Sequence, residues 1–104
     1  MSKPTDPARR VRALKALAHP SRLAAVELLA RGERCVCELQ KAMGSDLSTV
    51  SRHLKLLVDA GLLASRRQGQ WIFYRLRTTC LPDFLKCIDA VLAGGSCRAL
   101  AGRK

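Results

Sequence analysis

The sequence predicts a single, mainly α-helical domain that carries one small β-hairpin, an α+β fold. Two observations lead to this fold class. Apolar residues recur at helical spacing in five segments that Gly and Pro residues separate. One further segment, "LLASRRQGQWIFYRLR", abandons that spacing and gathers β-forming residues after Gln68-Gly69. The length of 104 residues fits one domain, and an aromatic content of 4% predicts a core of mainly aliphatic side chains.

The helices are expected to begin and end at recognisable signals. His19-Pro20 interrupts the first apolar pattern, because proline disfavours helix at the preceding residue and suits the first turn of a new helix. The expected helices cover 8–18, Pro20 to a stop at Gly32, 34–43 with a stop at Gly44, a cap at Asp46 or Ser48 to Gly61, and 81–92. Residues 1–7 and 94–104 are expected to be flexible, which leaves 8–93 as the folded domain.

The chain is strongly basic. It carries 19 Lys and Arg residues against 8 Asp and Glu, a formal net charge of +11 at pH 7. Such an imbalance is typical of chains that bind nucleic acid or an anionic membrane surface, and the alternative is a solvated surface with a basic bias. No run reaches the roughly 18 apolar residues that a membrane-spanning helix needs, so we expect no membrane partner.

The five cysteines are expected to be reduced. The opening stretch "MSKPTDPARR" is polar and lacks the apolar core of a signal peptide, which favours a cytoplasmic protein. There, cysteines are more often buried apolar residues, metal ligands or redox groups than disulfides, and an odd number argues against a closed disulfide framework. No C-x-x-C pair and no Gly-rich phosphate loop beside a strand is present, so we expect no enzyme and no permanent cofactor.

The segment from Arg34 to Gly61 has the outline of a helix-turn-helix: a short helix, a tight turn with Gly44, and an amphipathic helix. Hydroxyl groups can bond phosphates or base edges, Arg can hold guanine through two hydrogen bonds, and Lys suits a phosphate. His53 fits either a DNA contact or a helix histidine that is bonded within its own protein. The candidate DNA-binding residues of this helix are Ser48, Thr49, Ser51, Arg52, His53 and Lys55.

The basic hairpin after this helix is placed to act as a wing, which completes a winged helix-turn-helix and reaches the adjacent minor groove. Its tip carries the candidate DNA-binding residues Arg66, Arg67, Gln68 and Gln70. One Arg-Arg pair also fits a solvated hairpin, but helix, turn, helix and hairpin in this order favour binding to double-stranded DNA. The last helix has more apolar surface than one small core needs, which predicts a dimer interface.

Three stretches of the sequence carry a family resemblance. "LKALAHPSRLAAVELLARGERCVCEL", "LSTVSRHLKLLVDAGLLASRRQGQWIFYRL" and the trailing apolar helix resemble the ArsR/SmtB family of bacterial winged-helix repressors over residues 10–93. The resemblance implies a homodimer joined by the first and last helices. It also implies binding to an imperfect inverted repeat in the promoter of the protein's own operon, and release from that operator when an inducer binds.

Within that family, the "CVC" of Cys35 and Cys37 resembles the arsenic-responsive branch. The resemblance implies that both are thiolate ligands for As(III), and for Sb(III) as well. Soft thiolates suit such ions, and Arg34 together with a helix N-terminus is expected to stabilise a thiolate. Residues i and i+2 of a helix point to nearly opposite sides. We therefore expect that binding distorts the first turn of the helix and shifts the recognition helix.

The ligand set remains open at the level of the sequence. Gln40 stands where the arsenic-responsive pattern often has a third cysteine, so a third sulfur would come from Cys80, Cys87, Cys97, a small thiol or nowhere. Cys80 and Cys87 also fit buried interface residues, and Cys97 also fits a second site. The competing interpretations are a Cd(II) sensor, a thiol redox sensor and a constitutive DNA-binding protein with inert cysteines.

Overall fold

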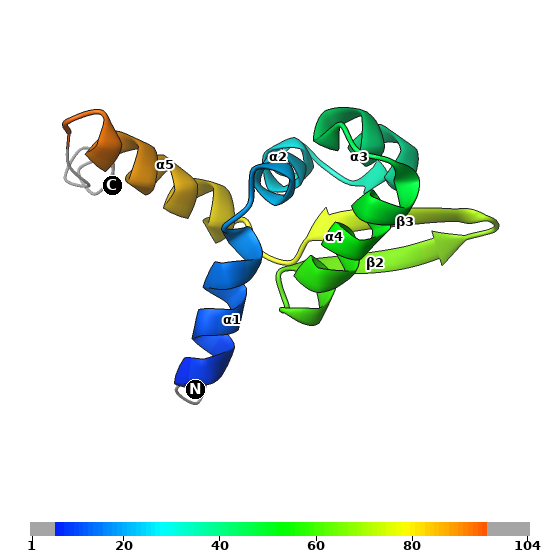
Figure 1. Cartoon of the computed structure of the whole chain (residues 1–104), viewed down its shortest axis with the longest axis horizontal. Coiled ribbons are helices and arrows are strands. Elements are labelled where there is room, and N and C mark those ends of the chain that lie inside the picture. The colour runs from blue at the N-terminus through cyan, green and yellow to red at the C-terminus, as the bar shows by residue number, and fades with distance from the viewer. Residues whose placement is uncertain (1–5, 96–104) are drawn as a thin grey trace.

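The computed structural model describes residues 6–95 and confirms five helices and a hairpin (Figure 1). In chain order the elements are α1 (Pro7–Leu17), α2 (Pro20–Leu29), β1 (Arg34–Cys35), α3 (Val36–Met43), α4 (Leu47–Asp59), β2 (Leu63–Gln68), β3 (Trp71–Leu76) and α5 (Cys80–Leu92). Figure 1 shows α2, α3 and α4 grouped at the centre, with the hairpin of β2 and β3 extending to one side. No helix in this part of the chain is long and apolar enough to cross a membrane.

The expected helix over 34–43 is wrong at its start. Arg34 and Cys35 form a short strand that pairs antiparallel with β3, Arg34 opposite Tyr74 and Cys35 opposite Phe73. The sheet therefore has three strands in the order β1-β3-β2. A strand of two residues is too short to show the alternation by which strands are recognised in a sequence, and only its pairing with β3 defines it.

The core lies between the central helices and the start of β2. Its fully buried large side chains come from α2, α3, α4 and β2, and they are Val26, Leu39, Val50, Leu54, Leu57 and Leu63. In contrast, α5 buries only Leu81, and α1 buries only Ala16 and Leu17. The two terminal helices are thus attached to the core at one end and leave most of their apolar surface uncovered.

Local signals explain the helix boundaries. Pro20 begins α2, and the ring of His19 caps it by accepting a hydrogen bond from the Ser21 N–H at 3.1 Å. Gly44 ends α3 as predicted, with a φ of 68° that an L side chain rarely adopts. Asp46 caps α4 through the N–H of Thr49.

The ends of α1 and α5 differ slightly from expectation. Asp6 caps α1 and Pro7 is its first residue, although both were expected to be flexible. Gly94 and Gly95, expected in the tail, donate hydrogen bonds to carbonyl groups in the last turn of α5. The rest of the expected flexible ends, with Cys97, lies outside the described residues.

Candidate thiol site and nucleic-acid interface

Cys35 and Cys37 lie side by side at the start of α3, and their Sγ atoms are 2.7 Å apart. The expectation that the two side chains point to opposite sides is wrong, because Cys35 is not helical. It is the N-cap of α3, with the extended backbone angles φ −81° and ψ 163°. Both cysteines are free thiols, Cys37 is exposed and Cys35 is half-buried. The two sulfurs therefore meet without any unwinding of the first turn.

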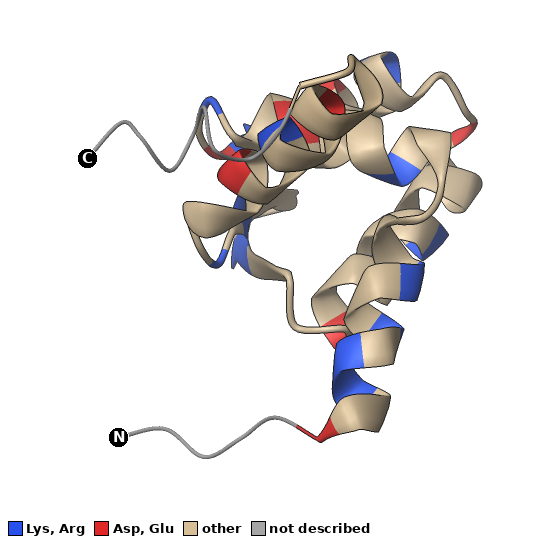
Figure 2. Cartoon of the chain, turned by 90° about the vertical axis from the view of Figure 1, so that its left-hand side faces the viewer, with Lys and Arg blue, Asp and Glu red and all other residues tan. Residues whose placement is uncertain are grey.

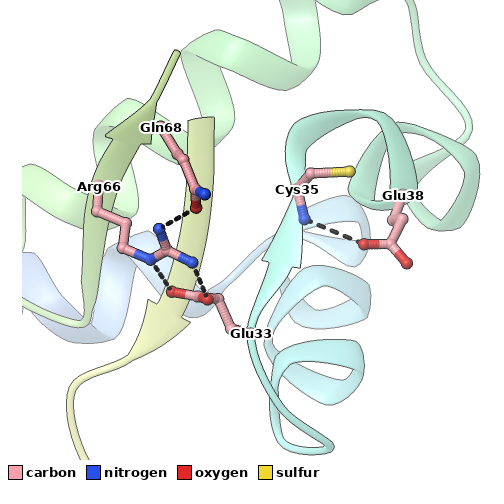
Figure 3. Close-up of polar contacts among 5 residues, drawn as sticks. All are labelled: Glu33, Cys35, Glu38, Arg66 and Gln68. Carbon is pink, nitrogen blue, oxygen red and sulfur yellow. Dashed lines mark hydrogen bonds and ion pairs between the residues drawn. The ribbon is translucent and has the colours of Figure 1, made fainter. Parts of the chain in front are cut away.

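A capping box holds this pair in place. The backbone N–H of Cys35 donates to Oε1 of Glu38 at 3.1 Å (Figure 3). In return, the backbone N–H of Glu38 faces the Cys35 side chain. The N–H of Cys35 lowers the pKa of the Glu38 carboxyl, which stays charged near the helix N-terminus. The geometry of the thiol pair is thus set by the same contacts that start α3.

The expected stabilisation of a thiolate is wrong for Cys35. The hydrogen bond with Cys37 is the largest influence on this thiol and raises its pKa above the usual 9.0, although the N–H of Glu38 acts in the opposite direction. A thiol proton that is held in a hydrogen bond to a second sulfur is harder to remove than the proton of an isolated thiol. Ligands that exchange with protonated thiols suit this pair.

No third ligand joins the pair within residues 6–95, where no group of three His, Cys, Asp or Glu side chains could hold a metal ion. Gln40, at the position of the missing cysteine, instead donates to the carbonyl of Ser45 at 3.3 Å and ties α3 to the turn before α4. Cys80 is exposed at the first residue of α5, and Cys87 lies half-buried in the same helix. The described residues thus offer two adjacent soft donors.

At the start of α4, the two candidate hydroxyl groups are engaged by the helix cap. Ser48 and Thr49 donate to the two carboxylate oxygens of Asp46 at 2.6 and 2.7 Å. These hydrogen bonds lower the pKa of Asp46 to about 2, so the carboxylate persists at neutral pH. Each hydroxyl keeps only its acceptor side for other partners, whereas Ser51 and Arg52 are exposed on the next turn.

Lys55 is also exposed, and its Nζ lies 3.2 Å from a carboxylate oxygen of Asp59, one turn later in α4. Surface pairs of this kind contribute little to stability. The ammonium group is therefore available to exchange Asp59 for a phosphate.

His53 is bonded within the protein. Nη1 of Arg22 lies 3.0 Å from His53 Nδ1, and the ring of His19 packs against His53 with centroids 4.5 Å apart. Because arginine can only donate, Nδ1 accepts and the neutral ring carries its proton on Nε2. Desolvation, followed by the charges of His19, Arg22 and Arg52, lowers the pKa of His53. The hydrogen bond with Arg22 agrees with the interpretation of His53 as a helix histidine that is bonded within its own protein. A contact between His53 and DNA stays a prediction.

Arg66, on strand β2 of the wing, is hydrogen-bonded to two other side chains. Its guanidinium binds both carboxylate oxygens of Glu33 at 2.8 Å and donates to Gln68 at 2.8 Å (Figure 3). It also lies 4.6 Å from the ring centroid of Phe73. Arg67 and Gln70 are exposed at the hairpin tip. Sequence reasoning missed Glu33 and Arg22, because their partners lie 33 and 31 positions away in the chain.

Comparison with known proteins identifies close similarities. A family model described as "Bacterial regulatory protein, arsR family" matches residues 19–65. The arsenic resistance transcriptional regulator ArsR1 of Pseudomonas putida is 44% identical over 77% of this chain and 60% of its own length. The arsenical resistance operon repressor of Escherichia coli is 46% identical over 76% of this chain and 68% of its own length.

A solved structure is similar over almost the whole described region. The solution structure of a homodimeric winged helix-turn-helix DNA-binding domain from Mycobacterium bovis, described as a possible ArsR-family transcriptional regulator, has a TM-score of 0.73 and 32% identity. The match covers 89% of this chain and 91% of that one, and it confirms the predicted winged helix-turn-helix. The chain spans only 60% of the Pseudomonas putida regulator. These relatives are named as regulators of transcription, not as enzymes.

Proposed function

Since the chain belongs to the arsR family of bacterial regulatory proteins, we propose that it represses transcription as a homodimer on operator DNA and is released by As(III). The inducer site is the thiol pair of Cys35 and Cys37, and Sb(III) is a second ligand of the same chemistry. The observation that carries the proposal is the 2.7 Å separation of the two sulfurs at the surface end of α3. The names of the curated relatives support arsenic as the stimulus.

The chemistry of the pair fits a thiophilic ion. Arsenous acid exchanges an As–OH group for an As–S bond at each thiol, and each exchange releases one water that carries away the thiol proton. Arsenic stays As(III), and no oxidant is needed. If As–S bonds resemble Zn–S bonds of about 2.3 Å, two sulfurs on one ion lie about 3.8 Å apart. The pair thus needs to open by about 1 Å, within reach of side-chain rotation. A small thiol or Cys97 can fill a third position.

The DNA-binding surface comprises α4 and the wing. Ser51 and Arg52 are proposed to contact base edges, and Lys55 a phosphate. Arg67 and Gln70 at the hairpin tip are proposed to reach the adjacent minor groove. Ser48, Thr49, His53, Arg66 and Gln68 are proposed to support this surface, since each is already bonded within the protein. The operator is an imperfect inverted repeat, as a twofold dimer requires.

Two sets of contacts connect the thiol pair to the DNA-binding surface. Leu39 and Met43 of α3 are buried in the same core cluster as Val50 and Leu54 of α4. A displacement of α3 at its start therefore reaches the recognition helix. On the other side, Cys35 lies in the strand that pairs with the wing strand β3. Release follows if the arsenic-bound conformation binds operator less tightly than the free one.

The dimer is proposed to form through α1 and α5. These helices expose large apolar side chains with exposed fractions from 41% to 79%, namely Val11, Leu14, Phe84, Ile88, Val91 and Leu92. Leu14, Phe84, Ile88 and Leu92 line one apolar cleft between the two helices. A second copy of the chain would cover this surface, as the homodimeric state of the Mycobacterium bovis domain supports.

Fluorescence anisotropy on DNA from the protein's own upstream region tests the proposal. Arsenite, and in a parallel titration Cd(II), is added to the reduced protein bound to labelled duplex. We expect arsenite to release wild type and the Cys80→Ser control but not the Cys35→Ser/Cys37→Ser variant. If arsenite leaves the wild-type complex intact, the inducer site is wrong, although DNA binding stands. If Cd(II) alone releases the complex, the site senses Cd(II).

The closeness of the two sulfurs also favours a second candidate, a thiol redox sensor. Peroxide could oxidise the pair to a disulfide, with loss of two protons and two electrons from the thiols and reduction of peroxide to water. The two candidates differ in their response to reductant. Arsenite should release DNA in excess monothiol reductant, whereas a peroxide response should disappear there.

A further inference from the structure

A groove between α1 and α4 is lined by three cationic side chains and by apolar residues, among them Val11 of the proposed dimer surface. Arg12 and Lys15 project into it from α1, Arg22 contributes from α2, and Leu56 of α4 forms part of the opposite wall. Among the described residues that line this groove, none is acidic. Arg12 and Lys15 are exposed, and Figure 2 shows Lys and Arg along much of α1. Sequence reasoning assigned none of these positions to DNA.

Arg22 is held rigidly at the base of the groove. Its Nε donates to the carbonyl of Ala16 at 2.7 Å, and Nη1 donates to His53 at 3.0 Å. A guanidinium has five N–H groups, and the remaining three have no hydrogen-bond partner within residues 6–95. An arginine already fixed in this way loses little side-chain freedom when it binds an anion.

The groove adjoins the recognition surface. Leu56, which is 42% exposed, lies one helical turn after Arg52 on the same side of α4. Arg22 and Arg52 both lower the pKa of His53, so both charges act on the same part of the molecule. Cationic side chains therefore extend from α4 across the groove to α1.

We propose that the α1–α4 groove is a second contact with the DNA backbone, in which Arg12, Lys15 and Arg22 bind phosphates beside the bases that α4 reads. This inference rests on the proposed function and extends the DNA-binding surface to α1. Flexible cations that contact phosphates supply affinity for any sequence and make it depend on salt, without reading bases. The groove should therefore strengthen operator and non-operator binding alike.

The test compares an Arg12→Gln/Lys15→Gln variant with an Arg31→Gln/Lys86→Gln control, which loses the same charge at exposed positions that do not line the groove. Arg22 stays unchanged because it also bonds Ala16 and His53. Anisotropy gives Kd on an operator duplex and an unrelated duplex over a range of NaCl concentrations. For a dimer, the groove variant should lower the slope of log Kd against log salt by about two to four, equally on both duplexes.

Each outcome is decisive. A control slope within about one of the wild-type value, beside the larger drop in the groove variant, supports the inference. Equal slopes in groove variant and control overturn it while the proposed function stands. A loss confined to the operator duplex also overturns it, because phosphate contacts do not distinguish sequences. Absence of any DNA binding by the wild-type chain would instead refute the proposed function, and the inference with it.

Discussion

Glu33 and Arg66 form a two-point ion pair that joins the segment before the thiol site to the wing. Nε and Nη2 of Arg66 each lie 2.8 Å from a different carboxylate oxygen of Glu33. The same guanidinium lies over Phe73, the residue that pairs with Cys35 in the sheet. Glu33 is two residues before Cys35, so one short stretch carries both a proposed inducer ligand and the anchor of a wing arginine.

Replacing Glu33 by Gln is expected to strengthen DNA binding. The carboxylate holds Arg66 and places a negative charge beside the wing, and the amide removes both effects. For a dimer, the slope of log Kd against log salt should rise by about two if each released Arg66 gains one phosphate. Anisotropy at several salt concentrations measures this. In an Arg66→Gln background the Glu33→Gln change should have much less effect, and an equal effect there would assign the gain to net charge alone.

The thiol pair should titrate as a unit. Cys37→Ala removes the hydrogen bond that favours the protonated form of Cys35, so the pKa of Cys35 should fall toward the usual 9.0. The measurement is the pH dependence of iodoacetamide alkylation, followed by mass spectrometry of the peptide that contains Cys35. Cys80→Ala is the control and should leave the profile unchanged. A Cys35 pKa that does not fall in the Cys37→Ala variant would show that the hydrogen bond between the two thiols does not raise it.

Stability should fall in mildly acidic solution. Burial and neighbouring cations lower the pKa of His53 in the folded state below the unfolded value of 6.5. Between these two values the unfolded chain binds more protons, so the free energy of unfolding decreases as pH falls through 6.5 toward the folded pKa. Urea unfolding at pH 7.5, 6.5 and 5.5 measures this. His53→Gln keeps an acceptor for Arg22 and should show a weaker pH dependence over this range.

Gly44 should tolerate only substitution by residues that adopt a positive φ readily, because its own φ is 68°. A Cβ at this position meets nothing within 4 Å, so the cost of Gly44→Ala comes from the backbone angle alone. We expect a loss of about 1–2 kcal/mol in the free energy of unfolding. Gly44→Asn should lose less, because Asn adopts this conformation more readily. Chemical unfolding of both variants measures the difference, and equal losses would point to a cause other than φ.

A carboxylate on the apolar face of α5 should dissociate the dimer. Ile88→Glu places a charge where a second copy would desolvate it, and we expect the dimer to weaken at least about tenfold, or 1.4 kcal/mol. Lys86→Glu introduces the same residue at an exposed position of the same helix and is the control. Sedimentation over a range of concentrations distinguishes the two. If Ile88→Glu remains as dimeric as Lys86→Glu, the interface lies elsewhere.

The order of elements could be predicted because it rests on local signals. Pro20, Gly44 and Gly61 mark boundaries through their own backbone preferences, and Val50, Leu54 and Leu57 show the buried face of α4 by their spacing. The strand β1 could not be predicted in this way. Two residues have no periodicity, and their extended conformation depends on hydrogen bonds to β3, almost 40 positions later.

The residues of the candidate site are proposed from the sequence, but their geometry could not be predicted from it. The sequence singles out Cys35 and Cys37 by their type and spacing, yet a helix at Cys35 would separate the sulfurs that the extended N-cap brings together. Likewise, the roles of Ser48 and Thr49 depend on which of two acceptors, Asp46 or a phosphate, lies nearer. Such choices are made by three-dimensional proximity, which residue types alone do not encode.

The position of the thiol pair outside the buried core has a consequence for how such a protein can change. Neither Cys35 nor Cys37 belongs to the buried core, which in α3 starts at Leu39. If the proposed inducer site is correct, substitutions at 35 and 37 should alter which ion is bound without changing a buried core residue. In the proposed mechanism, the residues that select the inducer are thus separate from the residues of α4 and the wing that bind DNA. For the design of biosensors, other metal-binding side chains can be substituted at these two positions and screened while the DNA-binding residues stay unchanged.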